Sequence, residues 1–215
     1  MSDWFYTLVR VVGTPAFWVS ASPIVLHPER ARRDGAFIVA ATHFSPYDVA
    51  ILVKDTPRHL DFVSIVEVFV KRWLIWFFTN MNAIPVDRSK VDTAATRRIL
   101  DRLLKGRAVA MFPEGRIVNE AQSVLNGGKI RPGVFGFARA ANCPVIPCVI
   151  LGTGAYSNPK SWAPLRKTVY AITYGEPLFP DESWDDVPTA EKILRDAYAK
   201  LHAELLAALG DRKFV

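Results

Sequence analysis

Short apolar runs alternate with amphipathic stretches along most of this chain. Four predominantly apolar runs have the length of strands and cover residues 36–41, 108–112, 145–151 and 167–174. Runs without regular polar positions are typical of strands buried in a sheet that is covered on both faces. Polar residues follow the first two runs directly, so we expect chemistry at the carboxyl ends of those strands.

Helices are predicted between these runs. Residues 92–105, 134–141 and 189–209 place apolar side chains at helical spacing, and glycine follows the first and the last of these segments. Thr189 is the expected N-cap of the last helix. Because strands and helices alternate without a linker-like segment, the sequence predicts an α/β fold: a single domain with a largely parallel central sheet covered by helices.

Two aromatic-rich segments do not follow this alternation. Residues 4–18 carry aromatic side chains at both ends and a single arginine, as in a helix at a bilayer interface or a helix packed on the core. We therefore expect residues 1–22 to be a membrane-interface or packing helix region that precedes the main domain, residues 23–215. Residues 62–78 contain an adjacent Lys-Arg pair, which fits either a lipid headgroup layer or a helix that covers one face of the sheet.

Composition and charge narrow the range of partners. Hydrophobic residues make up 50% of the 215 residues, which leaves apolar surface for a membrane, an acyl tunnel or a partner. Lys and Arg number 27 against 21 Asp and Glu, and the net charge of +6 favours an anionic partner. Without a long basic block or zinc-finger spacing, lipid and phosphorylated metabolites are favoured over nucleic acid. We expect no signal peptide and no transmembrane helix, since no segment has ~20 consecutive apolar residues.

The two cysteines, Cys143 and Cys148, flank an apolar run. Side chains an odd number of positions apart on a strand point to opposite faces, so we expect buried free thiols and no disulfide. Such thiols suit a reducing compartment. Two cysteines alone do not make a metal site.

The strongest candidate for chemistry is His43, which follows the first apolar run and precedes Asp48 by five positions. Ser45 and Pro46 break any helix through the histidine, so the chain can bend and bring the carboxylate to the imidazole. The carboxylate would orient the ring, and the second ring nitrogen would take a proton from a hydroxyl that attacks a thioester. The other three histidines are expected to be structural. A Gly-x-Ser-x-Gly sequence is absent, which argues against a serine hydrolase.

Candidate anion-binding residues follow other apolar runs. Arg88 can present two parallel donors to a phosphate, although alone it would be interpreted as a solvated surface residue. Lys129 and Arg131 precede the helix predicted at 134–141, whose N-terminus also suits an anion.

A further polar cluster follows the run at 108–112. Glu114 can accept a hydrogen bond from a substrate hydroxyl, Gly115 permits a tight turn or the close approach of a ligand, and Arg116 can bind a phosphate.

Taken in order, these clusters resemble the lysophosphatidic acid acyltransferases, also called 1-acyl-glycerol-3-phosphate acyltransferases. The family's motifs are His-x4-Asp, an arginine-containing stretch, Phe-Pro-Glu-Gly and Pro-Val-x-Pro, and they match, in order, residues 43–48, 82–88, 112–115 and 144–147. The match spans roughly residues 36–152, which is most of the main domain.

The resemblance implies an enzyme of phospholipid biosynthesis that moves a fatty acyl group from acyl-CoA or acyl carrier protein to the free hydroxyl of 1-acyl-glycerol-3-phosphate. His43 would be the general base and Asp48 its orienting partner, and Arg88, Glu114 and Gly115 would bind the acceptor. No metal and no cofactor other than the thioester co-substrate would be needed. Residues 23–215 would be the acyltransferase domain of a peripheral or monotopic enzyme on the cytoplasmic side of an anionic phospholipid membrane.

Two positions depart from the family pattern. Asn82 stands where a glycine is common, and Arg116 follows Gly115 directly where a Thr-Arg or similar pair is usual. Both lie near the expected acceptor site, so another lysolipid, a glycolipid or an amino-acid lipid is an alternative acceptor. A non-catalytic lipid-binding protein and a thioesterase are the alternatives from other classes.

Overall fold

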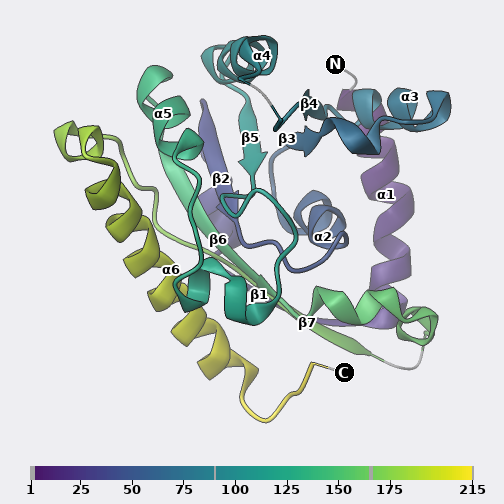
Figure 1. Ribbon diagram of the computed structural model, residues 1–215. Helices are drawn as coiled ribbons and strands as arrows, with labels where there is room; N and C mark the ends of the chain where they lie inside the picture. The colour runs from purple at the N-terminus through teal and green to yellow at the C-terminus, as the bar shows by residue number, and fades with distance from the viewer. Residues whose placement is uncertain (1–2, 90, 165–166, 215) are drawn as a thin grey trace.

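A twisted sheet with the strand order β1-β7-β6-β2-β5-β3-β4 forms the centre of the molecule (Figure 1). The computed structural model describes residues 3–89, 91–164 and 167–214. The strands are β1 (Ala21–Leu26), β2 (Phe37–Ala41), β3 (Leu60–Ile65), β4 (Ile84–Val86), β5 (Ala108–Met111), β6 (Val145–Leu151) and β7 (Thr168–Tyr174). Neighbouring strands are parallel except for β6 and β7, which are antiparallel. The prediction of a largely parallel sheet is therefore confirmed.

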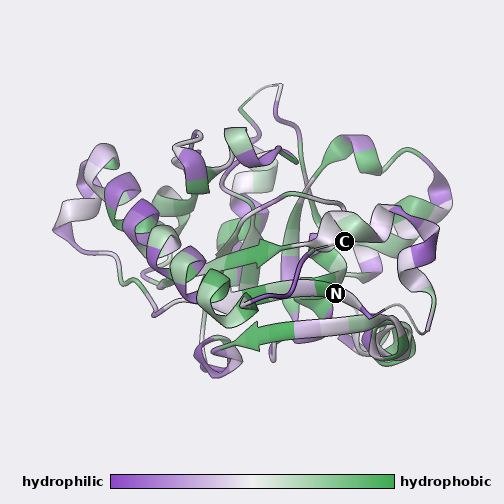
Figure 2. Ribbon diagram, turned by 90° about the horizontal axis from the view of Figure 1, so that it is seen from below, coloured by the Kyte–Doolittle hydropathy of each residue, from purple (hydrophilic) through white to green (hydrophobic). Residues whose placement is uncertain are grey.

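Helices cover both faces of the sheet, as expected for strands that are apolar on both sides (Figure 1). On one side lie α1 (Asp3–Ser20), α2 (Asp48–Asp55) and α3 (Arg72–Asn80), and on the other lie α4 (Thr93–Leu104), α5 (Gly133–Ala140) and α6 (Val187–Leu209). The three helices predicted after residue 90 correspond to α4, α5 and α6. Much of the sheet is hydrophobic, whereas the long helix α6 mixes hydrophobic with hydrophilic positions (Figure 2).

Two predicted boundaries were wrong. Helix α6 begins at Val187, and its N-cap is Asp186, whose side chain accepts from the N–H of Thr189 at 3.1 Å. Proline in the first turn suits this earlier start, because proline lacks the N–H that a helix leaves unpaired there. Residues 62–78 do not form one helix: their first part belongs to β3, which pairs with both β4 and β5, and only their last part belongs to α3.

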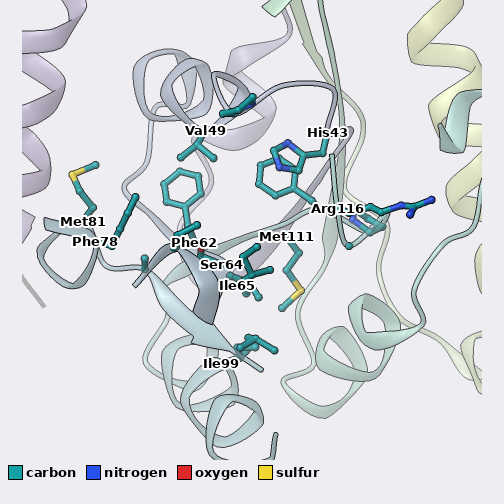
Figure 3. A pocket seen from close by; sticks show the side chains of 18 of the residues that line it. His43, Val49, Phe62, Ser64, Ile65, Phe78, Met81, Ile99, Met111 and Arg116 are labelled. Atoms are coloured by element: carbon teal, nitrogen blue, oxygen red, sulfur yellow. The ribbon is translucent and has the colours of Figure 1, made fainter. Parts of the chain in front are cut away.

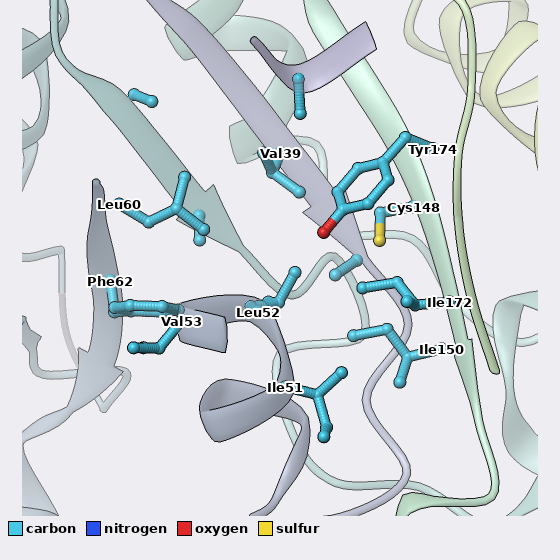
Figure 4. Packing of buried hydrophobic residues seen from close by; sticks show 14 of the residues in the cluster. Val39, Ile51, Leu52, Val53, Leu60, Phe62, Cys148, Ile150, Ile172 and Tyr174 are labelled. Carbon is cyan, nitrogen blue, oxygen red and sulfur yellow. The ribbon is translucent and has the colours of Figure 1, made fainter. Parts of the chain in front are cut away.

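Helix α2 is held against the sheet by the apolar core on its side (Figure 4). Ile51 and Leu52 are fully buried there, and they pack among strand residues such as Val39 and Ile150. Burial of side chains of this size stabilises the folded state by roughly 1.5–3 kcal/mol each. The packing therefore fixes the helix whose first residue, Asp48, enters the active site.

Helix α1 has an inner and an outer face. Phe5, Tyr6 and Phe17 are buried against the core, whereas six large apolar side chains point away from it. These exposed residues are Trp4, Leu8, Val11, Val12, Trp18 and Val19. One face of α1 thus packs on the core, as one of the two expectations had it, and the opposite face leaves apolar side chains exposed. Within the described residues, no helix is both long and apolar enough to cross a bilayer.

Candidate active site

His43 and Asp48 meet just beyond the carboxyl end of β2. The Nδ1 atom of His43 lies 3.0 Å from Oδ2 of Asp48, and the aspartate is fully buried. The chain turns through Ser45 and Pro46 before α2 begins, so the two side chains meet despite their spacing of five residues. This contact directs Nδ1 to the carboxylate and leaves Nε2 to face a substrate.

The Asp48 carboxylate is held by donors other than the histidine. Its Oδ2 atom accepts from the main-chain N–H groups of Phe44 and Ser45, each at 2.8 Å. Its Oδ1 atom accepts from the hydroxyl of Thr153, which lies fully buried just after β6. Four donors therefore satisfy the buried charge and fix the orientation of the carboxylate.

The His43 ring is also fixed by packing. The ring of Phe112 stacks on it with centroids 3.9 Å apart and planes inclined by 16°. Phe112 follows β5, which is the neighbour of β2 in the sheet, and this register brings the two loops together. One face of the imidazole is thereby covered, and His43 lines the adjacent cavity.

A large cavity begins at His43 and has a volume of about 1050 Å³ (Figure 3). In this view His43 and Arg116 lie on one side, and Phe78 and Met81 lie across from them. Its lining is mainly apolar, and a cavity of this size is at the upper end of ordinary ligand sites. The space suits a long apolar substrate better than a small polar one.

The cavity reaches apolar residues on both faces of the sheet. Val53 and Phe62 belong to the core on the α2 side, whereas Ile99, Met111 and Val134 belong to the core on the α4–α6 side, and all five line the cavity. The cavity therefore touches both faces of the sheet near its β3–β4 edge.

Basic side chains surround the polar mouth of the cavity. Arg88, Arg116, Lys129 and Arg131 are all exposed and all line it. Arg88 donates to the carbonyl of Gly115 through Nη1. The four cations that were predicted from three separate segments are therefore brought to one place, where they can bind a phosphate next to His43.

Gly115 is required where these basic residues meet. Its φ angle is +71°, and a β-carbon at this position would lie only 2.1 Å from Nε of Arg131. Any other residue would displace the Arg131 side chain or strain the turn. The sequence led us to expect a tight turn or a ligand close to Gly115. In this structure the group close to Gly115 is the Arg131 side chain.

Glu114 lies behind the site and is not among the residues that line the cavity. Its side chain is 6% exposed, and both of its carboxylate oxygens accept hydrogen bonds from protein donors. Burial raises the pKa of this carboxyl above its ordinary value, although the hydrogen bonds oppose that shift. The predicted contact with a substrate hydroxyl is therefore not supported by the position of the side chain, which lies outside the cavity lining and is bound to three protein donors.

Other nucleophiles and metal ligands are poorly placed. Cys143 and Cys148 are buried free thiols, as predicted, and burial raises the pKa of Cys143 to about 11 and that of Cys148 well above its usual range. A buried thiol with a raised pKa is a weak nucleophile. Across the described parts of the chain, no three His, Cys, Asp or Glu side chains gather as a metal site.

Comparison with known proteins assigns the family. The family model described as Acyltransferase matches residues 23–151, which is more than half of the chain. This protein therefore belongs to the acyltransferase family, and its His43–Asp48 pair lies within the matched region.

Named relatives point in the same direction. The chain is 26% identical over 171 residues to 1-acyl-sn-glycerol-3-phosphate acyltransferase of Bacillus subtilis (strain 168), and the match covers 79% of each chain. It is 27% identical over 125 residues to a chloroplastic 1-acyl-sn-glycerol-3-phosphate acyltransferase of Brassica napus, covering 56% of this chain and 34% of that protein.

A solved structure has the same fold. The 1-acyl-sn-glycerophosphate (LPA) acyltransferase PlsC from Thermotoga maritima superposes with a TM-score of 0.74 at 20% sequence identity. The superposition covers 94% of this chain and 80% of that one. The same α/β architecture therefore underlies both proteins.

Proposed function

We propose that this protein is a 1-acyl-sn-glycerol-3-phosphate acyltransferase that transfers a fatty acyl group from a thioester to lysophosphatidic acid. The observation that carries the proposal is a carboxylate-oriented histidine at the junction of a basic mouth and a large apolar cavity. The names of the Bacillus subtilis and Brassica napus relatives support the same acceptor. The donor is acyl-CoA or acyl carrier protein, and the reaction needs no metal.

In the proposed reaction, Nε2 of His43 takes the proton of the acceptor hydroxyl as its oxygen attacks the thioester carbonyl carbon. The carbon–sulfur bond then breaks, and the departing thiolate recovers the proton from the imidazolium. Asp48 holds Nδ1 throughout and stabilises the imidazolium. The basic side chains bind the phosphate of the acceptor, and the apolar cavity binds the acyl chain.

The first test follows thiol release from palmitoyl-CoA with and without lysophosphatidic acid. Release by the wild type should require the acceptor. His43→Ala should lower kcat by about 10²–10⁴-fold, because it removes the general base. Asp48→Asn should lower kcat by a similar or smaller factor, because it removes the carboxylate that orients the base. Full release without acceptor would identify a thioesterase, and an unchanged rate in His43→Ala would exclude this mechanism.

We further propose that the protein binds peripherally to an anionic bilayer on the cytoplasmic side, through α1 and α3. Helix α3 has no buried residue, and its Trp73, Ile75 and Trp76 are exposed. Trp4 and Trp76 both pack against the ring of Phe5, so the apolar faces of the two helices are adjacent. Tryptophan is favoured at bilayer interfaces.

Two basic residues support the same orientation. Lys71 and Arg72 are exposed at the N-terminal end of α3, where their charges can reach anionic headgroups. Helix α1 also lines the cavity with Val9 and Gly13, so an acyl chain can enter beside the helix that contacts the lipid. Within the predicted region 1–22, helix α1 would then form the membrane-interface part, whereas Ala21 and Ser22 belong to β1 and residues 1–2 lie outside the described residues.

A further inference from the structure

The main chain of His43 is held at both of its polar groups by the segment that follows β5. Its N–H donates to Oε2 of Glu114 at 2.7 Å, and its carbonyl accepts from the N–H of Val118 at 2.9 Å. Phe112, in the same segment, stacks on the imidazole. Residues 112–118 therefore contact the histidine at three points, two of them on the main chain.

Glu114 connects this segment to a third part of the chain. Its Oε1 atom accepts from the hydroxyl of Ser123 at 2.9 Å and from the N–H of Val124 at 3.0 Å. Ser123 is fully buried and lies outside the cavity lining. One carboxylate thus accepts three hydrogen bonds, of which one holds His43 and two hold the carboxylate itself.

We propose that Glu114 is a positioning residue: its carboxylate fixes the main chain of His43, and Ser123 fixes that carboxylate in turn. This inference rests on the proposed role of His43 as the base, and it differs from the acceptor-binding role that the family resemblance implies for Glu114. Only a carboxylate offers two acceptor oxygens and no N–H, which is what three converging donors require. Displacement of a catalytic group by about 1 Å can cost 10²-fold in rate.

Glu114→Gln is the first test, because it keeps the size of the side chain and replaces one acceptor by a donor. Whichever way the amide turns, it points N–H groups at the N–H of either His43 or Val124. We expect kcat to fall by about 10–100-fold while KM for lysophosphatidic acid stays within about twofold. A raised KM with unchanged kcat would mean that Glu114 binds the acceptor, and would overturn the proposal.

Ser123→Ala tests the same connection from a residue that does not line the cavity. It removes one of the two donors to Oε1, so kcat should fall about three- to tenfold in the same direction and KM should again be unchanged. In the Glu114→Gln background, Ser123→Ala should have little further effect, because both act through one carboxylate. Independent, multiplying effects of the two substitutions would contradict the proposed connection.

Asn119→Ala provides the matched control. Asn119 is exposed in the same loop and caps the turn at residues 120–122 by accepting from the N–H of Gln122. Among the described residues, no hydrogen bond joins it to Glu114. This substitution should leave kcat unchanged if the effect of Ser123→Ala arises through Glu114. A loss of kcat equal to that of Ser123→Ala would indicate general loosening of the loop. Rates are compared well below the melting temperature of each variant, so that lost stability is not mistaken for lost positioning.

A readout without substrate separates this inference from the proposed function. The His43 amide, bonded to a buried carboxylate, should be protected from hydrogen exchange in the wild type and at least tenfold less protected in Glu114→Gln and in Ser123→Ala. Protection that is unchanged in both variants would overturn the positioning role, even if acyl transfer is confirmed. If the wild type had no acyl transfer activity but both variants lost protection of the His43 amide, the positioning role of Glu114 would stand and the proposed reaction would be rejected.

Discussion

Two buried carboxylates act on His43 in different ways. Asp48 holds the ring through Nδ1, whereas Glu114 holds the main-chain N–H. Each carboxylate accepts further hydrogen bonds from the protein, so neither can rotate without losing several partners at once. The imidazole is consequently fixed in both position and direction before any substrate binds.

The raised pKa of Glu114 predicts an acid-side dependence. The native state binds a proton at this carboxyl more tightly than the unfolded chain does, so its contribution to the free energy of unfolding is fully present below the ordinary value of 4.5. That contribution is lost as pH rises through the raised native value. We therefore expect the stability of the wild type relative to Glu114→Gln to decrease as pH rises through this window.

Urea unfolding of both proteins over a pH series measures this difference. Over the same window the ratio of kcat of the wild type to kcat of Glu114→Gln should rise with pH, because only the wild type gains a deprotonated carboxyl that accepts at both oxygens. If the stability difference falls with pH while the kcat ratio rises, the effect of Glu114 on the rate is not a consequence of its effect on folding. A stability difference that does not vary with pH would show that Glu114 has an ordinary pKa.

The sequence predicted the contact between site residues that are close in the chain, but not the contacts between distant ones. His43 and Asp48 are five residues apart, so a helix-breaking Ser-Pro between them was enough to predict their contact. Glu114 lies 71 residues from His43, and Thr153 lies 105 residues from Asp48. Those contacts depend on the register of the sheet, and nothing in the local pattern around Thr153 signals them.

At the scale of single elements, α1 forms one wall of the cavity. Gly13 lines the cavity, and a β-carbon built on it would have no atom within 4 Å. Glycine within a helix costs up to about 1 kcal/mol relative to alanine, so its presence here favours open space over helix stability. The absence of a side chain at this position leaves room for an acyl chain.

Gly13→Leu should therefore narrow the range of acyl donors. The leucine side chain can enter the cavity without a clash near its β-carbon and should exclude the distal methylenes of a long chain. Since each buried methylene contributes about 0.8 kcal/mol, kcat/KM for palmitoyl-CoA should fall at least tenfold while that for octanoyl-CoA changes little. Gly13→Ala is the control, and an equal loss for both donors would place the acyl chain elsewhere.

The sequence did not predict three of the strands, and two of these three are edge strands that contain proline. Strand β4 has three residues and contains Pro85, and β1 contains Pro23. Both lie at the edges of the sheet, where a proline without an N–H donor is tolerated. The four predicted strands include the central β2, β5 and β6, whose apolar residues are buried from both sides. Strand β3 lies inside the sheet but was also missed, because Asp61 and Ser64 interrupt its apolar residues. Apolar runs therefore predicted β2, β5, β6 and β7, but neither the two edge strands nor β3.

At the scale of the whole molecule, the apolar surface is concentrated on one pair of helices. Four exposed tryptophans lie on α1 and α3, and both helices also contribute residues to the cavity wall. Exposure of this apolar surface to water is unfavourable, whereas contact with a lipid surface would bury it.

The double variant Trp4→Ser/Trp73→Ser should bind vesicles of anionic phospholipid about tenfold or more weakly than the wild type, because each tryptophan loses apolar burial in the interface. Flotation with vesicles measures the bound fraction. Leu104→Ser is the control, since Leu104 is 73% exposed but lies on α4. Equal losses for the two proteins would argue against α1 and α3 as the docking face.

The burial of both cysteines has a practical consequence for following the reaction. In the proposed reaction, turnover liberates one free sulfhydryl for each acyl group transferred. Aromatic disulfide reagents react with this sulfhydryl and develop colour in proportion to it. Cys143 is 2% exposed and Cys148 is fully buried, so the folded protein contributes no background to such an assay. When the core opens, the same reagent gains two titratable sulfhydryls per chain. A single reagent can therefore measure thiol release by the folded protein and cysteine exposure when the protein unfolds.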